Sequence, residues 1–154
     1  MGKDKGLDLL DQQIIKLLQK DGRLSNTAIA KKVDTSEGTV RVRLNRLIKE
    51  EYIQIVAVSN PLKLGFPITG IMDINVDIKK TKQVTEALKK LKPVWFVVHT
   101  TGGSDIKVEF VAKSIDDLNT LIFEKIHKID GVVKTETSLI VDFIKRRYDW
   151  GTGY

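Results

Sequence analysis

Apolar residues recur every three or four positions in three short runs of the N-terminal third of the chain, which is the period of an amphipathic helix. The first run follows Asp8, which favours an N-cap position, and ends before Gly22. Ser25 and Ser36 can cap the second and third runs in the same way. The residues expected to face the core are Leu10, Ile14, Leu17, Leu18, Ile29, Ala30, Val33, Val40, Leu44, Leu47 and Ile48. The pattern predicts a domain of three helices over residues 1–52.

From Ile53 to Val58 the period changes to the two-residue alternation of a strand, and Asn60-Pro61 ends it. This segment is expected to be a hinge strand. Beyond it, six segments follow in the order β-α-β-β-α-β, the split βαβ arrangement of ferredoxin-like folds. Their expected ranges are 68–78, 82–91, 94–101, 106–113, 115–129 and 134–144. The expected fold class is α+β, with a hinge strand and linker over 53–66, a second domain over 67–145 and a tail over 146–154.

Composition narrows the picture mainly by exclusion. Apolar residues make up 42% of the chain and charged residues 30%, which is typical of a folded globular protein. The absence of cysteine excludes disulfides and thiolate metal sites, and it fits a reducing cytoplasm. The first residues lack the apolar core of a signal peptide, and no stretch approaches the roughly 20 apolar residues of a membrane span. We therefore expect a cytoplasmic protein that makes no membrane contact.

Positive charge is concentrated on the third predicted helix. Lys plus Arg exceed Asp plus Glu by 26 to 20 in the whole chain, and the segment 36–49 holds four basic residues against Glu37 alone. With about 100° of rotation per residue, the outer face of this helix shows Gly38, Thr39, Val42, Asn45, Arg46 and Lys49, with Arg41 and Arg43 on its flanks. A basic face on the last of three short helices is typical of a helix-turn-helix domain, in which the second helix of the motif enters the major groove of DNA.

The residue types on this face suit contacts with duplex DNA. Thr39 and Val42 can meet a thymine methyl or a base edge, and Arg41 and Arg46 can hydrogen-bond guanine or phosphate. Backbone amides at capped helix starts are natural ligands of phosphate oxygens. The alternative is an ordinary solvated helix of a small bundle, but the two serine caps and the short connecting turn favour DNA binding. The expected contact residues are Ser25, Ser36, Gly38, Thr39, Arg41, Val42, Arg43, Asn45, Arg46 and Lys49.

The ordered set of these residues resembles the Lrp/AsnC family of bacterial and archaeal regulators. The matching positions are Leu7-Asp8, Asp11, Ile14-Ile15, Leu17-Leu18, Asp21-Gly22-Arg23, Ala30, Ser36, Thr39-Val40, Arg43, Leu47, Pro61, Leu64-Gly65, Gly102 and Asp105. Two positions depart from the family, because Asp34 and Glu51 stand where it usually has glycine. Aspartate tolerates a left-handed turn at modest cost, so we expect the turn to survive. Glu51 indicates a different exit from the third helix.

The resemblance implies a transcription regulator with a RAM-type, ACT-like second domain. It implies homodimers, assembled further into tetramers or octamers, that bind palindromic sites on double-stranded DNA. It also implies an amino acid or related small-molecule effector bound between dimers, and the positions that correspond to its pocket are Gly102, Gly103, Ser104, Asp105, Thr137 and Ser138. Turn amides can hold a carboxylate, and Asp105 can accept from an ammonium group. The alternative is that residues 102–105 form only a tight hairpin connection.

No motif in the chain points to catalysis. His99 and His127 are far apart without metal-ligand spacing, and no nucleophile-elbow motif is present. Sirohaem decarboxylases resemble the family in architecture, but they would need histidine or arginine facing the haem after the hinge, and Ala57 to Gly70 contains neither. A third alternative is an ACT-like sensor that acts on another protein, against which the basic third helix argues. We expect a regulator that is not an enzyme and has no cofactor and no metal site.

Overall fold

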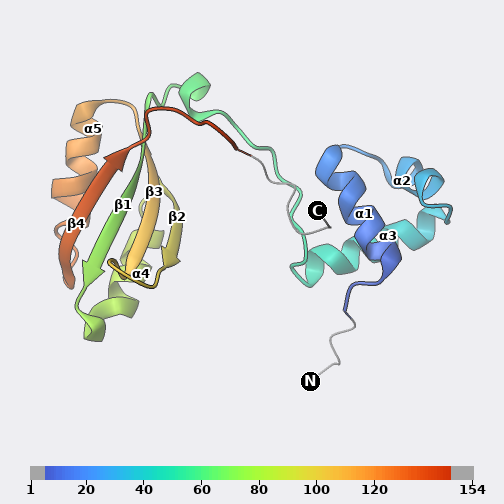
Figure 1. Ribbon diagram of the computed structural model, residues 1–154, viewed down its shortest axis with the longest axis horizontal. Coiled ribbons are helices and arrows are strands. Elements are labelled where there is room, and N and C mark those ends of the chain that lie inside the picture. The colour runs from blue at the N-terminus through green and yellow to red at the C-terminus, as the bar shows by residue number, and fades with distance from the viewer. Residues whose placement is uncertain (1–5, 147–154) are drawn as a thin grey trace. The chain divides into compact units, whose positions relative to one another are not determined.

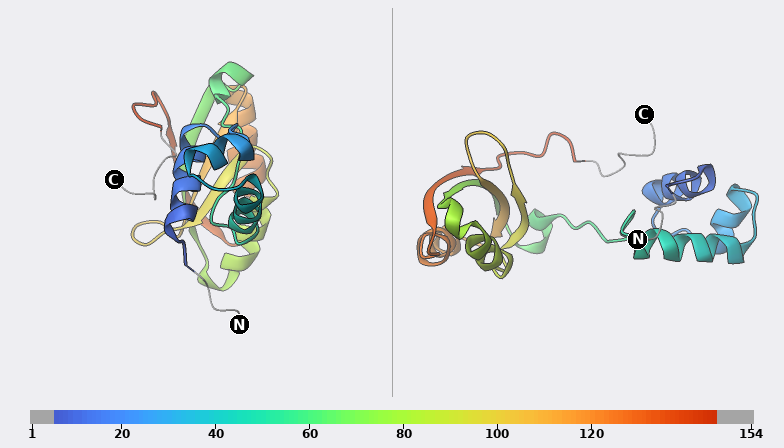
Figure 2. Two further views of the ribbon diagram at one scale, coloured as in Figure 1. Left: turned by 90° about the vertical axis from the view of Figure 1, so that its right-hand side faces the viewer. Right: turned by 90° about the horizontal axis from the view of Figure 1, so that it is seen from below.

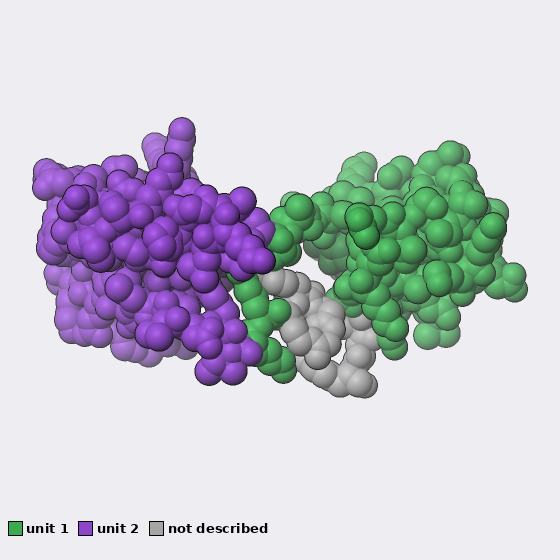
Figure 3. All heavy atoms as spheres, turned by 90° about the horizontal axis from the view of Figure 1, so that it is seen from above, with its two compact units in different colours: residues 1–58, 145–154 green, residues 59–144 purple. Residues whose placement is uncertain are grey.

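The computed structural model describes residues 6–146 (Figure 1). Contacts divide the chain into two compact units (Figure 3). The helical unit comprises Met1–Val58 with Lys145–Tyr154, and the sheet unit comprises Ser59–Ile144.

The helical unit contains α1 (Leu9–Lys20), α2 (Asn26–Lys32) and α3 (Glu37–Lys49), and each begins at the residue that the sequence predicted. Asp8 caps α1 through a reciprocal capping box, in which its side chain accepts from the Asp11 amide and the Asp11 side chain accepts from the Asp8 amide. The Ser25 hydroxyl accepts from the Ala28 amide, and the Ser36 hydroxyl accepts from the Thr39 amide. The predicted caps are confirmed.

Apolar side chains of all three helices meet in one core. Its buried members are Ile14, Ile15, Leu18, Ile29, Ala30, Val40 and Leu47. Leu10, Leu17, Val33 and Leu44 pack against this core while remaining partly exposed. The predicted inward face is thereby confirmed except at Ile48, whose side chain is exposed.

Both departures from glycine adopt the left-handed conformation. Asp34 has φ +50° in the turn before α3, as expected for an aspartate there. Glu51 has φ +61°; its amide donates to the carbonyl of Ile48, and the Tyr52 amide donates to that of Leu47. This is the Schellman pattern that usually carries glycine. The expectation of a different helix exit is therefore wrong: glutamate occupies the usual exit at a conformational cost.

The sheet unit is a four-stranded antiparallel sheet in the order β2-β3-β1-β4. Its strands are β1 (Ile68–Val76), β2 (Val94–His99), β3 (Ile106–Ala112) and β4 (Val132–Leu139). The helices α4 (Thr81–Lys89) and α5 (Ile115–Asn119) lie on the same face of this sheet (Figures 1 and 2). Three short helices complete it: η1 (Pro61–Leu64), η2 (Ile78–Lys80) and the π-helix η3 (Thr120–Ile126), which continues α5. The predicted β-α-β-β-α-β order is confirmed.

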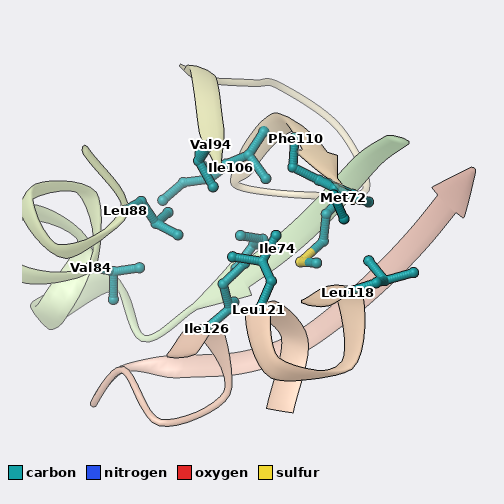
Figure 4. Close-up of a cluster of buried hydrophobic side chains, with 12 residues drawn as sticks. Met72, Ile74, Val84, Leu88, Val94, Ile106, Phe110, Leu118, Leu121 and Ile126 are labelled. Carbon is teal, nitrogen blue, oxygen red and sulfur yellow. The ribbon is translucent and has the colours of Figure 1, made fainter. Parts of the chain in front are cut away.

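The core of the sheet unit fills the space between the sheet and its helices. Met72 and Ile74 of β1 and Phe110 of β3 point toward side chains from the helices, including Leu88 of α4 and Leu121 of η3 (Figure 4). The other buried members are Val84, Val94, Ile106, Val108, Ala112, Leu118 and Ile126. Among the described residues of the sheet unit, no helix lies on the opposite face of the sheet, which we call the open face.

Three predicted elements differ from the structure. Residues 53–60 form no strand, because strand hydrogen bonds need a neighbouring strand and none pairs with this segment among residues 6–146 of the single chain. The last strand ends at Leu139 instead of residue 144. The second long helix changes to π geometry after Asn119, and its last bond runs from the His127 amide to the Ile122 carbonyl. Hydrophobic periodicity cannot distinguish such a segment from an α-helix.

The left-handed conformation of Glu51 leads to a stability prediction. Glu51→Gly should raise the free energy of unfolding of the helical unit by about 0.5–1 kcal/mol, because glycine adopts positive φ without steric cost. The control is Glu50→Gly, at a φ of −87° that suits any residue. This change also removes the 3.5 Å ion pair with Arg46, and it should lower stability. Hydrogen exchange of α3 amides measures both effects. Destabilisation by Glu51→Gly would contradict the assignment of strain at this residue.

Candidate nucleic-acid interface

One face of α3 is exposed from Val42 to Lys49. Gly38, Val42, Asn45 and Lys49 follow one another at intervals of three or four residues and define what we call the outer stripe. The last three are exposed, and the Val42 side chain keeps 66% of its surface accessible although it is apolar. Arg41 is exposed beside the stripe and pairs with Glu37 at 3.7 Å. Arg41, Val42, Asn45 and Lys49 are thus exposed as expected, whereas Gly38 and Thr39 of the predicted outer face are only partly exposed.

The side chains of Arg43 and Arg46 are directed away from the outer stripe and toward α1. The Arg43 guanidinium bonds the carboxylates of Asp8 and Asp11, the latter at 3.2 Å, and Arg46 bonds Asp11 through Nη2. Only 32% and 25% of the two arginine side chains is exposed. The expectation that Arg46 lies on the outer face is therefore wrong. A helical wheel gives the direction of a side chain but does not show that the neighbouring helix offers it a carboxylate.

Asp11 is the centre of this group, which we call the carboxylate–arginine cluster. Its side chain has no exposed surface, and its oxygens accept from the Asp8 amide, from Arg43 and from Arg46. The Asp11 amide and the Arg43 guanidinium lower the pKa of Asp8 below its ordinary value. Asp8 raises the pKa of Arg43, and Asp11 raises the pKa of Arg46. The cluster therefore fixes α3 against the first turn of α1 through ion pairs.

The hydroxyl groups at the helix starts are already engaged in the structure. Ser25 and Ser36 are exposed and act as caps, and the Ser36 and Thr39 hydroxyl oxygens lie 2.8 Å apart. A DNA phosphate would therefore contact the backbone amides at the start of α3 that have no partner within the helix, because the serine hydroxyl is already hydrogen-bonded.

Two further cations near α3, Lys31 and Lys32, were not among the sequence candidates. They are exposed in the last turn of α2, directly before the connection to α3. Cations in the last turn of a helix commonly stabilise it by interacting with the helix dipole. The sequence alone therefore gave no reason to assign these lysines a role in binding.

The predicted effector loop packs against one end of β1. The Ser104 hydroxyl donates to Asp73 at 2.8 Å, and the Asn75 amide group donates to the Gly103 carbonyl at 3.0 Å. One oxygen of Asp105 accepts from the Val76 amide at 2.9 Å. Hydrogen bonds from Ser104 and from Lys107, whose ammonium lies 3.1 Å away, lower the pKa of Asp73. Asp73 and Asn75 were not among the sequence candidates.

Thr137 and Ser138 of β4 do not share a surface. Thr137 is paired with Met72, which faces the helices, whereas Ser138 is paired with Ile71 on the open face. Successive residues of a strand point to opposite faces, so within one chain the six effector candidates do not converge on a single pocket. Of the two, Ser138 is on the face that carries Asp73.

The part of the chain that the structure describes has neither a cluster of metal-ligating side chains nor a helix suited to span a membrane. Between residues 6 and 146, no group of three or more His, Asp or Glu side chains is arranged to hold a metal ion. None of the helices in that range combines the length and apolar character that crossing a bilayer requires.

A three-helix domain whose last helix exposes the outer stripe beside basic residues, joined to a ferredoxin-like sheet domain, defines a two-domain DNA-binding transcription regulator. Residues 7–54 match the model of winged helix-turn-helix DNA-binding domains, and residues 69–150 match the Lrp/AsnC ligand-binding domain. The chain belongs to the Lrp/AsnC family.

Relatives from archaea support this assignment. An HTH-type transcriptional regulator of Pyrococcus horikoshii is 39% identical over 94% of this chain and 90% of its own length. The regulator LrpA of the same organism is 34% identical over 90% of this chain and 99% of its own length. These relatives are transcription regulators and not enzymes, so the chain is a regulator and the decarboxylase alternative is set aside.

The fold is shared with a solved member of the family. The structure of E. coli AsnC superposes with a TM-score of 0.83 and 26% identity, covering 93% of this chain and 97% of the other. Together with the family match, this likeness confirms the expected α+β architecture.

Proposed function

We propose that the chain is a sequence-specific regulator that binds a palindromic DNA site as a homodimer and responds to an amino acid or a related metabolite. The single observation that carries DNA recognition is the outer stripe of α3. An exposed valine beside asparagine and basic residues offers apolar contact to a thymine methyl, a bidentate amide for adenine, and charge for phosphate. Because the target of such a protein is chromosomal DNA, we propose that it is located in the cytoplasm.

The stripe assigns different roles to the candidate residues. Val42 and Asn45 face base edges, while Arg41 and Lys49 bind guanine or phosphate at the margins. Amides at the starts of α2 and α3, next to Ser25 and Ser36, approach the backbone together with Thr39 and the two lysines of α2, and Gly38 permits close approach. Arg43 and Arg46 support α3 through the carboxylate–arginine cluster and make no base contact.

The salt dependence of DNA binding tests this assignment. Lys49→Gln should lower the slope of log K against log salt concentration by about 1, because one phosphate contact is lost. The matched control, Lys82→Gln on α4 of the sheet unit, removes the same charge and should leave the slope unchanged. Equal slopes for Lys49→Gln and the parent would refute the proposed interface.

Dimer formation is proposed through the open face of the sheet. This face carries apolar side chains of three strands, namely Ile71, Phe96, Val98 and Val111, among charged ones such as Asp73, Lys107 and Glu109. Apolar residues on a sheet face without helices favour cover by a second copy, as family membership also suggests. A dimer would place two helix-turn-helix units on half-sites about one helical turn apart, or a multiple of it.

The dimer prediction is tested by Ile71→Lys. A lysine in the centre of the open face should convert the dimer to a monomer in sedimentation velocity experiments, because burial would desolvate its charge. Ile78→Lys provides the control, since Ile78 is 86% exposed in η2 outside the sheet and should leave the dimer intact. A dimeric Ile71→Lys variant would exclude this interface.

The effector is proposed to bind beside the loop 102–105, in contact with a second copy. A solved protein of the same fold from Neisseria meningitidis, 19% identical with a TM-score of 0.85 over 95% of this chain and 97% of its own, is described as an L-Met complex. In this chain, the amides of Gly102 and Gly103 suit a carboxylate, and Oδ1 of Asp105 suits an ammonium group. Thr137 and Ser138 would contribute only if partner copies bring both faces of β4 into use, as in a tetramer or octamer.

Selection of bound genomic fragments, repeated with and without each amino acid, tests effector and operator together. One amino acid should change the set of bound fragments, and Asp105→Asn should remove that response while DNA binding without effector persists. An unchanged fragment set with every amino acid would refute the proposed effector class.

A further inference from the structure

Two of the cations on α3 are held away from its outer stripe by a carboxylate of another helix. Arg43 and Arg46 lie one turn apart and share the α3 segment that carries Val42 and Asn45. Asp11 of α1 binds both guanidinium groups. Asp8 adds a second partner for Arg43, and Glu50, the C-cap residue of α3, adds a second partner for Arg46 at 3.5 Å. The positively charged face of α3 is therefore narrower than its sequence suggests.

We infer that Asp11 is a specificity-determining residue of the DNA interface, because it keeps Arg43 and Arg46 on the α1 side of α3 and out of reach of the duplex. The inference rests on the proposed use of α3 as the recognition helix. Asp11 acts through the two arginines, so it is a positioning residue and does not itself touch DNA.

The burial of Asp11 makes this hold strong. The Asp11 side chain has no exposed surface, so water cannot solvate its negative charge. An arginine that turned toward DNA would leave this buried charge without one of its positive partners, which is energetically costly. The contrast is Arg41, whose partner Glu37 lies on the same helix at 3.7 Å and keeps 42% of its side chain exposed. Such surface pairs contribute little, so Arg41 can exchange its partner for phosphate or guanine.

The consequence for recognition concerns the balance between specific and non-specific binding. Guanidinium groups that reach phosphates increase affinity for every sequence through counterion release. Two additional free arginines on α3 would therefore strengthen binding to arbitrary DNA and reduce the share of the interaction that Val42 and Asn45 direct to particular bases. Retaining these arginines on Asp11 favours specific sites.

The test compares Asp11→Asn with Asp21→Asn in the full chain. Both changes remove one negative charge from the helical unit, but Asp21 is half-exposed and its partner Arg23, 95% exposed, is already accessible. Binding of each variant to a duplex of arbitrary sequence is measured at several salt concentrations. Asp11→Asn should steepen the slope of log K against log salt by about 1–2 relative to Asp21→Asn. It should also lower the ratio of specific to non-specific affinity, on the order of tenfold.

A purely structural role for Asp11 would lower the melting temperature without changing the salt slope, so a folded Asp11→Asn variant with the slope of Asp21→Asn would overturn the inference. If circular dichroism shows that Asp11→Asn does not fold, the salt slope of Arg46→Gln tests the inference instead. It should leave the slope of the parent unchanged, since Arg46 does not reach DNA, and a decrease of about 1 would overturn the inference.

These outcomes separate this inference from the proposed function. Failure of the recognition-helix assignment shows as an unchanged slope in Lys49→Gln, whereas failure of the positioning role shows only in the Asp11 and Arg46 variants.

Discussion

A carboxylate without exposed surface lies between two helices of the N-terminal unit and is matched by two guanidinium groups. Asp11 completes the capping box of α1 and pairs with Arg43 and Arg46 of α3. Removing charge from water is costly unless each charge finds a close partner, so this arrangement is stable only at one relative placement of the two helices. The orientation of α3, and with it the direction of the outer stripe, depends on this group.

The three N-terminal helices could be predicted from the sequence because capping residues and apolar periodicity are local signals. Asp8, Ser25 and Ser36 cap the helices in the structure, and the apolar period identifies the side of each helix that the core covers. The sheet topology followed from the order of the periods. The helix exit at Glu51 was misjudged because hydrogen bonds from two successive amides hold glutamate in a conformation that it disfavours by itself.

The parts that sequence reasoning missed depend on contacts between distant residues. Arg46 appeared to belong to the outer face because its helical angle alone does not show that Asp11, thirty-five positions earlier, attracts it. The hinge segment 53–58 has the alternation of a strand, but a strand forms only beside another, and the described part of one chain supplies none. Thr137 and Ser138 were chosen by family position, whereas strand geometry places them on opposite faces.

The most direct measurement is a structure of the chain bound to a DNA fragment selected by it. We expect α3 to lie in the major groove with Val42 and Asn45 against base edges and Lys49 near a phosphate, while Arg43 and Arg46 remain on Asp11. A complex in which α3 points away from the duplex, or in which Arg46 leaves Asp11 to contact a base, would contradict this expectation.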